Sequence, residues 1–244
     1  MILSRIYSII ISDKAWKGLN NKLSINSKQS VKCPKCGQLH EICVWSSITV
    51  SDSPDLKKDL LSGKINMLHC DICGQTALLP EPLLYHDEDK KLLISFTPCN
   101  DEKIKERLLC DLRENSRKSG ELENYEGYNL RFITDYNHLL ETILVFDNGL
   151  QDKVTELIKL LILSQEQDKA EHRTVVFGKR DDKEIEFFIQ DSSDGMCYTS
   201  RVPMDTYDTI YKALAESGVK YKSFNWEEID SYYATKMLKG MNNA

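Results

Sequence analysis

The sequence predicts an α+β fold, and three observations predict it. Two Cys-x-x-Cys-Gly turns lie within a stretch rich in β-branched and aromatic residues. Apolar residues then recur at helical spacing through the middle of the chain. After His172, short alternating segments separated by polar turns indicate strands again. A chain of 244 residues is long enough for one large domain or two smaller ones.

The paired cysteines are the most specific feature of the chain. They lie in the segments Cys33-Pro34-Lys35-Cys36-Gly37 and Cys70-Asp71-Ile72-Cys73-Gly74. Two residues between cysteines let both sulfurs of a pair reach one ion, and the following glycine permits a positive φ. Two such turns supply four thiolates, the tetrahedral set that Zn²⁺ prefers. The sequence therefore predicts one structural Zn²⁺ per chain, bound by Cys33, Cys36, Cys70 and Cys73.

The residues around these pairs predict a zinc-ribbon-like β domain over residues 31–98. β-branched and aromatic residues predict a strand at 41–50. Ser53 and Pro54 are typical of the start of a helix, and Gly63 is typical of its end. Three further segments are predicted as strands: 65–69, 78–85 and 91–96, the last two joined by a polar turn at 86–90.

A helical region is predicted over residues 99–170, continuing the same domain. Asn100 begins a helix that runs to about Arg117, and Gly120 ends it. The later helices share an apolar stripe that is typical of an antiparallel helix pair. The elements expected after the first helix are a strand at 129–133, a helix from Thr134 or Asp135 to the break at Asp147-Asn148-Gly149, and a helix over the apolar residues 154–162.

A small α/β unit is predicted over residues 171–244. Asp205-Thr206-Tyr207-Asp208 resembles a capping box that begins a helix, and Asn225-Trp226-Glu227-Glu228 resembles a second one before the last helix. Because this part carries its own caps and apolar alternation, residues 173–244 are predicted to be stable on their own. Its strands are expected at 174–178, 184–189, 196–202 and 221–224.

The composition favours a protein of the reducing cytoplasm without a membrane partner. Hydrophobic residues make up 41% and charged residues 29%, as in ordinary globular proteins. Residues 1–30 are predicted to be an N-terminal extension rather than a signal peptide, because no small-residue cleavage site follows their short apolar run. Eight cysteines are too few for a disulfide scaffold, so free thiols are expected at Cys43, Cys99, Cys110 and Cys197.

Other interpretations of the cysteine pairs and their neighbours are weaker. A redox-active pair places its attacking cysteine at the start of a helix, and Gly37 and Gly74 oppose helix continuation. His40 and His69 lie close to the pairs in sequence, but four thiolates already complete a tetrahedron. Both histidines are therefore predicted to be packed or hydrogen-bonded rather than to bind the metal.

Two further segments have the residue types of a functional site. Tyr85-His86-Asp87 looks catalytic, but adjacent strand residues point to opposite faces, so a hairpin turn is the favoured interpretation. Asp191-Ser192-Ser193-Asp194-Gly195 lacks the full ligand pattern of a Ca²⁺ loop and is also predicted to be a turn. The sequence contains no glycine-rich phosphate loop, zincin helix or nucleophile elbow.

The segment from Val31 to about Leu163 resembles the CpXC domain, a family named for two Cys-x-x-Cys motifs. One position departs from that pattern, since Asp71 stands where the name places proline, which zinc coordination does not require. The resemblance implies a zinc-ribbon-like domain and brings no reaction with it, because the family is a domain of unknown activity. It is carried by the two cysteine segments, Trp45, Asn66, Tyr85-His86-Asp87 and Phe96-Thr97-Pro98.

These features predict a zinc-stabilised, non-enzymatic cytoplasmic module that binds another protein. The reason is that a closed four-thiolate site leaves no position for a catalytic water. Two alternatives stay open: an enzyme with its site between the ribbon and the C-terminal unit, and a ribbon that binds nucleic acid. The second is disfavoured because residues 31–98 carry seven Lys/Arg and nine Asp/Glu. Trp45 and Tyr85 are the candidate anchors for a partner where exposed, although burial is expected for Trp45.

Overall fold

The computed structural model describes residues 23–165, 167–222 and 225–241. Within them the chain combines helices with strands in separate sheets, which confirms the predicted α+β class. The chain divides into two compact units. Unit 1 consists of Met1–Leu140 and Ser223–Glu227, and unit 2 consists of Glu141–Lys222 and Glu228–Ala244. Each unit is therefore built from two separate stretches of sequence.

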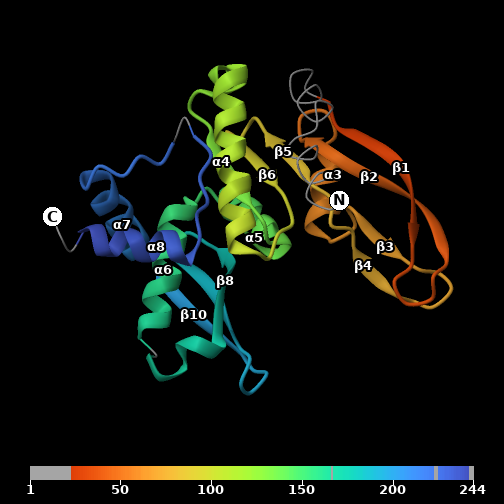
Figure 1. Ribbon diagram of the computed structural model, residues 1–244. Helices are drawn as coiled ribbons and strands as arrows, with labels where there is room; N and C mark the ends of the chain where they lie inside the picture. Colours follow the sequence, from red (N-terminus) through yellow and green to blue (C-terminus); the bar gives the residue numbers. More distant parts are fainter. Residues whose placement is uncertain (1–22, 166, 223–224, 242–244) are drawn as a thin grey trace. The chain divides into compact units, whose positions relative to one another are not determined.

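A five-stranded mixed sheet forms the framework of unit 1 (Figure 1). Its strands are β1 (Ile25–Lys32), β2 (Leu39–Thr49), β5 (Leu83–Asp87), β6 (Leu92–Phe96) and β7 (Asn129–Ile133), and they lie in this order across the sheet. β1 and β2 pair antiparallel, as do β5 and β6, whereas β2 with β5 and β6 with β7 are parallel. Parallel pairs need long crossover connections, and both of these connections contain helical residues here.

A second, two-stranded sheet follows β2 in the chain. β3 (Met67–His69) and β4 (Thr76–Leu78) pair antiparallel. The single strand predicted at 78–85 is therefore wrong, since β4 ends at Leu78 and β5 begins at Leu83. Pro80 and Pro82 lie between these strands, and neither has an N–H group for a strand ladder. Residues of both sheets form one small apolar cluster, whose buried members are Cys33, Val44, Leu68, Cys70 and Leu79.

The helices predicted before and within the middle region are confirmed, with side-chain caps at two of them. The carboxylate of Asp101 accepts the N–H of Ile104 at 3.0 Å, and Gly120 ends the same helix at φ +67°. The carboxylate of Asp135 accepts the N–H of His138 at 2.8 Å. The helices are α3 (Pro54–Leu61), α4 (Glu102–Ser119), η1 (Glu121–Tyr125) and α5 (Tyr136–Asp147), the last of which crosses the limit between the units.

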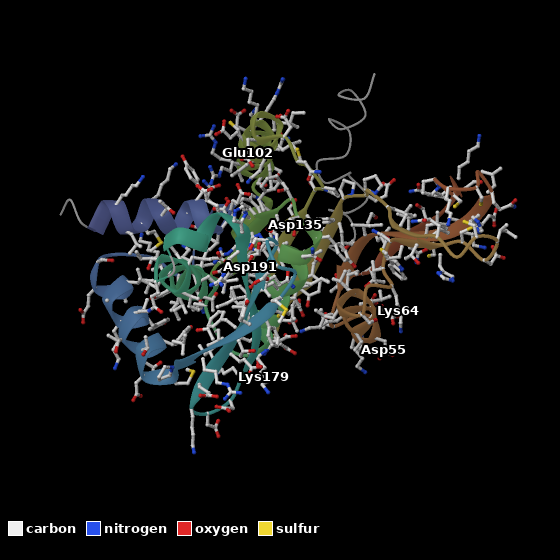
Figure 2. The ribbon with its side chains drawn as sticks, turned by 90° about the horizontal axis from the view of Figure 1, so that it is seen from below. Asp55, Lys64, Glu102, Asp135, Lys179 and Asp191 are labelled. Atoms are coloured by element: carbon white, nitrogen blue, oxygen red, sulfur yellow. The ribbon has the colours of Figure 1, made fainter. Side chains whose placement is uncertain are left out.

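Negative side chains at helix starts complement the positive end of the helix dipole (Figure 2). Asp55 lies in the first turn of α3 and Glu102 in the first turn of α4. Ser53 occupies the N-cap position predicted for it, but its hydroxyl donates to the carboxylate of Asp52 at 2.8 Å instead of accepting a helix N–H. The start of α3 is therefore stabilised by the negative charge of Asp55 and not by a hydrogen bond to the hydroxyl of Ser53.

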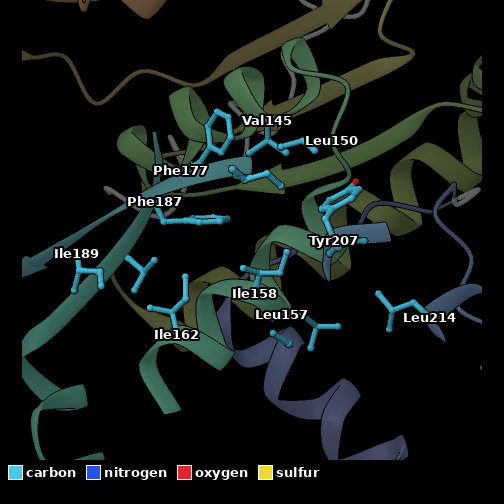
Figure 3. Packing of buried hydrophobic residues seen from close by; sticks show 14 residues of the cluster. Val145, Leu150, Leu157, Ile158, Ile162, Phe177, Phe187, Ile189, Tyr207 and Leu214 are labelled. Carbon is cyan, nitrogen blue, oxygen red and sulfur yellow. The ribbon is translucent and has the colours of Figure 1, made fainter. Parts of the chain in front are cut away.

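Unit 2 packs helices against a three-stranded antiparallel sheet, and Figure 3 shows the buried residues of this core. Its core contains Ile158 and Ile162 from α6, Phe177 from β8, and Phe187 and Ile189 from β9. The sheet has the order β10-β9-β8, which confirms the predicted meander. The elements are α6 (Asp152–Ser164), η2 (Gln167–His172), β8 (Arg173–Arg180), β9 (Glu184–Asp191), β10 (Cys197–Pro203), α7 (Met204–Glu216) and α8 (Ser231–Met241).

Both capping boxes predicted in this half of the chain are wrong. α7 begins at Met204, with Pro203 at its N-cap, so Asp205 lies inside the helix. α8 begins at Ser231, and the carboxylate of Asp230 accepts the N–H of Tyr233 at 2.8 Å. Residues 225–227 pair with unit 1 instead, as described below. The strand predicted at 221–224 is a bend at residues 221–222, and the remainder lies outside the described residues.

The domain limits predicted at residues 30, 98 and 170 stay a prediction. β1 begins at Ile25 and runs across the first of these limits. The apolar run at the very start of the chain lies outside the described residues. Among the helices that the structure describes, none is long and apolar enough to cross a membrane.

Candidate metal centre

The two cysteine turns have the same backbone hydrogen bonds. In the first, the N–H of Cys33 donates to the carbonyl of Gln38 at 2.8 Å, and the N–H of Gly37 donates to the carbonyl of Cys33 at 2.9 Å. Residues 70–75 repeat both bonds at the same lengths. Gly37 and Gly74 have φ values of +76° and +68°, which a residue with a side chain rarely adopts. The repeated Cys-x-x-Cys-Gly-Gln sequence therefore produces two matched turns.

The four sulfurs of these turns lie together. Cys33 Sγ is 3.6 Å from Cys73 Sγ, and Cys36 Sγ is 3.6 Å from Cys70 Sγ. All four sulfurs lie within 4.8 Å of one another. Zn–S bonds of about 2.3 Å give a tetrahedron with edges of about 3.8 Å, whereas a disulfide needs about 2.05 Å. The structure thus places the four cysteines where they can hold one metal ion.

The pKa values of the thiols show how the four sulfurs affect one another's ionisation. The N–H of Cys36 stabilises the Cys33 thiolate and, against the effect of burial, lowers the pKa of Cys33 to about 6. The N–H of Gln38 favours the Cys36 thiolate, but burial and the neighbouring sulfurs outweigh it and raise the pKa of Cys36 to about 12. The same opposing effects raise the pKa of Cys73. One thiolate therefore suppresses the others, and a bound dication removes that repulsion.

Asn66 joins the two strand pairs that carry the turns. Its side-chain carbonyl accepts the N–H of Trp45 at 2.7 Å, and its side-chain NH₂ donates to the carbonyl of Trp45 at 2.9 Å. Its own carbonyl accepts the N–H of Leu79 at 2.8 Å. The backbone of Asn66 has φ +54°, a conformation that asparagine tolerates better than most residues. One buried side chain thus connects β2 to the β3–β4 hairpin.

The two histidines near the site have polar neighbours. His69 Nδ1 lies 3.3 Å from the hydroxyl of Thr76, as predicted for a hydrogen-bonded histidine. His40 Nδ1 lies 3.6 Å from the exposed carboxylate of Asp71. His40, Asp71 and Cys70 form a second close group of possible ligand atoms, which shares Cys70 with the four-cysteine set. His40 therefore lies beside Cys70, one of the four clustered cysteines.

The prediction that Tyr85-His86-Asp87 forms a turn is wrong, because Tyr85, His86 and Asp87 lie in β5 and are buried. Asp87 accepts the hydroxyl of Tyr85 at 3.2 Å and the ammonium of Lys57 at 2.8 Å. His86 points to the other face, where its Nε2 lies 3.3 Å from the hydroxyl of Tyr128. The strand alternation separates the histidine from the carboxylate, so these residues form no relay.

The turn predicted at residues 191–195 is confirmed. The N–H of Gly195 donates to the carbonyl of Asp191 at 2.9 Å. The carboxylate of Asp191 accepts the N–H of Ser193 at 2.9 Å and the guanidinium of Arg173 at 2.8 Å. These hydrogen bonds, with the hydroxyl of Ser193 first among them, hold the pKa of Asp191 well below its usual range. The carboxylate of Asp191 therefore stabilises the turn.

The predicted anchor residues differ in exposure. Tyr85 is fully buried, so the prediction of Tyr85 as an exposed anchor is wrong, and Trp45 is half-buried. The exposed apolar side chains near the cysteine turns are instead Leu39, 54% exposed, and Ile72, 68% exposed. Ile72 is one of the two residues between Cys70 and Cys73. The turn does not require the side chain of either residue to be buried. Sequence patterns alone carried no signal that distinguished these two residues from core residues.

Four cysteines on two matched turns, one at the β1–β2 pair of the mixed sheet and the other at the β3–β4 pair, fit a metal-binding module. A family model described as CpXC protein matches residues 31–159, and the chain belongs to that family. The match confirms the resemblance seen in the sequence. No curated protein and no solved structure shows a significant match to this chain.

Proposed function

We propose that the chain is a zinc-stabilised, non-enzymatic module that binds another protein in the cytoplasm. The observation that carries this proposal is the closed set of four sulfurs from Cys33, Cys36, Cys70 and Cys73. Thiolates in tetrahedral arrangement favour Zn²⁺ over the hard cations, which prefer oxygen ligands. The exposed free thiols of Cys43, Cys110 and Cys197 fit a reducing compartment.

The donor set supports a structural role for the metal. Four thiolates complete the coordination of Zn²⁺ and leave no position for a water or a substrate. They also place negative charge on the metal, which weakens it as a Lewis acid. Cys33 and Cys70 are among the few buried residues of their apolar cluster, so the metal substitutes for a larger core at this end of unit 1.

The surface beside the metal centre supports a protein partner. Leu39 and Ile72 expose apolar side chains that are typical interface anchors once they are covered. The residue composition of 31–98 does not favour a phosphate backbone, because acidic residues outnumber basic ones. We therefore assign partner binding to the end of unit 1 that carries Leu39, Ile72 and the two cysteine turns.

A pull-down from the native host with matched variants tests this function. Ile72→Ser removes an exposed apolar side chain at the metal end, and Leu161→Ser removes one that is 40% exposed in unit 2. The proposal expects a partner that the wild-type chain and Leu161→Ser retain and that Ile72→Ser loses at least about tenfold. Equal retention by both variants contradicts it. Tight binding to mixed DNA or RNA that falls steeply with salt establishes the nucleic-acid alternative instead.

A further inference from the structure

Three residues from the C-terminal half of the chain extend the sheet of unit 1. Residues 225–227 lie along the outer edge of β7, and Glu227 pairs with Arg131 in a parallel bridge. The N–H of Phe132 donates to the carbonyl of Glu227 at 2.9 Å, and the N–H of Glu227 donates to the carbonyl of Leu130 at 3.0 Å. This is the hydrogen-bond pattern of strand addition, in which an extended peptide pairs with a free sheet edge.

Trp226 anchors this segment against α4. Its side chain is completely buried, and its indole N–H donates to the hydroxyl of Ser116 at 2.9 Å. Its carbonyl accepts the guanidinium of Arg113 at 2.9 Å. Leu108 and Leu112, also on α4, belong to the same apolar cluster. Helix α4 therefore packs against the indole ring of Trp226 and also makes hydrogen bonds to its polar atoms.

The buried guanidinium of Arg131 contacts the next residue of the segment, Glu227. Arg131 is 1% exposed, and its guanidinium lies 3.2 Å from the carboxylate of Glu227, which is 20% exposed. Asn129 and the carbonyl of Leu130 also accept hydrogen bonds from this guanidinium. A buried guanidinium held by such neighbours is pre-organised to receive a carboxylate. Three side-chain contacts thus favour a Trp-Glu pair over other dipeptides: the burial of the indole, its hydrogen bond to Ser116 and the ion pair of the carboxylate with Arg131.

The position of the segment in the chain indicates that it can be separated from the rest of unit 1. It lies outside residues 31–159, which the family model matches, and unit 2 residues stand on both sides of it in sequence. Within the described residues, the N–H groups of Phe132 and Glu227 make the backbone hydrogen bonds between the segment and β7, whereas β5 and β6 share a ladder of five residue pairs. Segments with few ladder hydrogen bonds open more readily than a central ladder does, and here the buried side chain of Trp226 is the main contact that opening has to break.

We propose that the edge of β7 together with α4 is a binding site for an extended peptide with adjacent Trp and Glu residues. Residues 225–227 occupy this site in cis and leave it as a unit. When they leave, the site takes a Trp-Glu segment supplied in trans. This site is separate from the metal centre and does not rest on the function proposed for that centre.

A peptide with the sequence of residues 225–230, Asn-Trp-Glu-Glu-Ile-Asp, tests the proposal with the full-length chain. Trp226→Ala removes the indole of the cis segment, so this variant is expected to bind the labelled peptide at least about tenfold more tightly than the wild-type chain does. The same peptide with alanine in place of tryptophan is expected not to bind. A folded Trp226→Ala chain with one equivalent of metal that fails to bind the peptide overturns the proposal, and so does equal binding by the wild-type chain.

Hydrogen exchange on the wild-type chain keeps the proposal testable where Trp226→Ala fails to fold. The amides of Phe132 and Glu227, which hold the segment, are expected to exchange together and at least about tenfold faster than the amides of the β5–β6 ladder. Glu227→Gln is expected to accelerate both and to leave the metal content unchanged. Exchange of the two amides as slow as that of the ladder shows a permanent core segment and overturns the proposal.

Discussion

The metal end of unit 1 and the core of unit 2 are stabilised in different ways. The cluster at the metal end has five buried members, and two of them are the metal-site residues Cys33 and Cys70. Among the described residues, the core of unit 2 has fourteen buried members, and all of them are apolar or aromatic. A small cluster cannot bury enough apolar surface to hold two hairpins, whereas a large one can. With the proposed zinc bound, the chain relies on ligation in one region and on packing in the other.

Removal of the metal is expected to have the largest effect and to affect one region only. Structural zinc sites contribute apparent free energies of about 10–16 kcal/mol in small peptides, so a strong chelator should unfold β1 to β4. The core around Phe177 and Phe187 contains no metal ligand and should stay folded. NMR spectra before and after chelation measure both regions at once. Loss of the unit 2 signals together with those of the metal end would show that the two regions are not independent.

Fragments test whether the limit predicted at residue 170 marks a folding unit. The core of unit 2 takes Val154, Leu157 and Ile158 from α6, which a fragment of residues 171–244 lacks. That fragment should not unfold cooperatively, because each missing side chain contributes about 2–4 kcal/mol of packing. A fragment of residues 141–244 restores α6 and should give a cooperative transition by circular dichroism. Cooperative unfolding of the shorter fragment would support the predicted limit instead.

Adjacent phenylalanines in β9 offer a matched test of packing in unit 2. Phe187 is completely buried in the core, and Phe188 is 37% exposed on the other face of the sheet. Phe187→Ala should lower the free energy of unfolding by about 3–5 kcal/mol, and Phe188→Ala by less than about 1 kcal/mol. Denaturant titration measures both. Neither substitution should alter the metal content, and a loss of metal from Phe187→Ala would contradict the separation of the two regions.

Asn66→Ala tests the packing contribution within the metal end. The substitution removes two hydrogen bonds to the backbone of Trp45 and places alanine at φ +54°. The expected loss is about 1–3 kcal/mol, because each buried hydrogen bond contributes about 0.5–1.5 kcal/mol. Thermal unfolding of the metal-bound chain measures the loss, with the exposed Asn26→Ala as control. Equal midpoints for the two variants would show that ligation alone holds the β3–β4 hairpin.

Acidification is expected to have the smallest effect. Burial raises the pKa of Asp87, but the hydrogen bond from Lys57 and those from Lys90 and Tyr85 outweigh it and hold the pKa below its usual value. A lowered folded-state pKa stabilises the protein above the unfolded pKa of about 3.9 and loses that contribution as the pH falls through the folded value. The difference in urea midpoint between wild-type and Lys57→Met should therefore shrink below about pH 4. A constant difference would contradict an ionic contact.

Features set by neighbouring residues were predictable, and those set by distant pairing were not. The cysteine turns, the end of α4 at Gly120 and the strands of unit 2 depend on a few consecutive residues each. The parallel pairing of β2 with β5, and the burial of Tyr85 and Asp87, depend on where distant segments meet. Trp226 shows most clearly what the sequence alone could not predict. Its sequence context resembles a helix cap, but pairing with β7 determines its structure.

Metal analysis of the purified full-length chain tests the central claim most directly. We predict one zinc per chain for the wild type and for Cys110→Ser, whose thiol is exposed and lies outside the metal centre. We predict a loss of most of that zinc from the double variant Cys36→Ser with Cys73→Ser, because two of four ligands are removed. Wild-type protein with zinc far below one equivalent, or a double variant with unchanged zinc, would contradict a metal centre formed by these four cysteines.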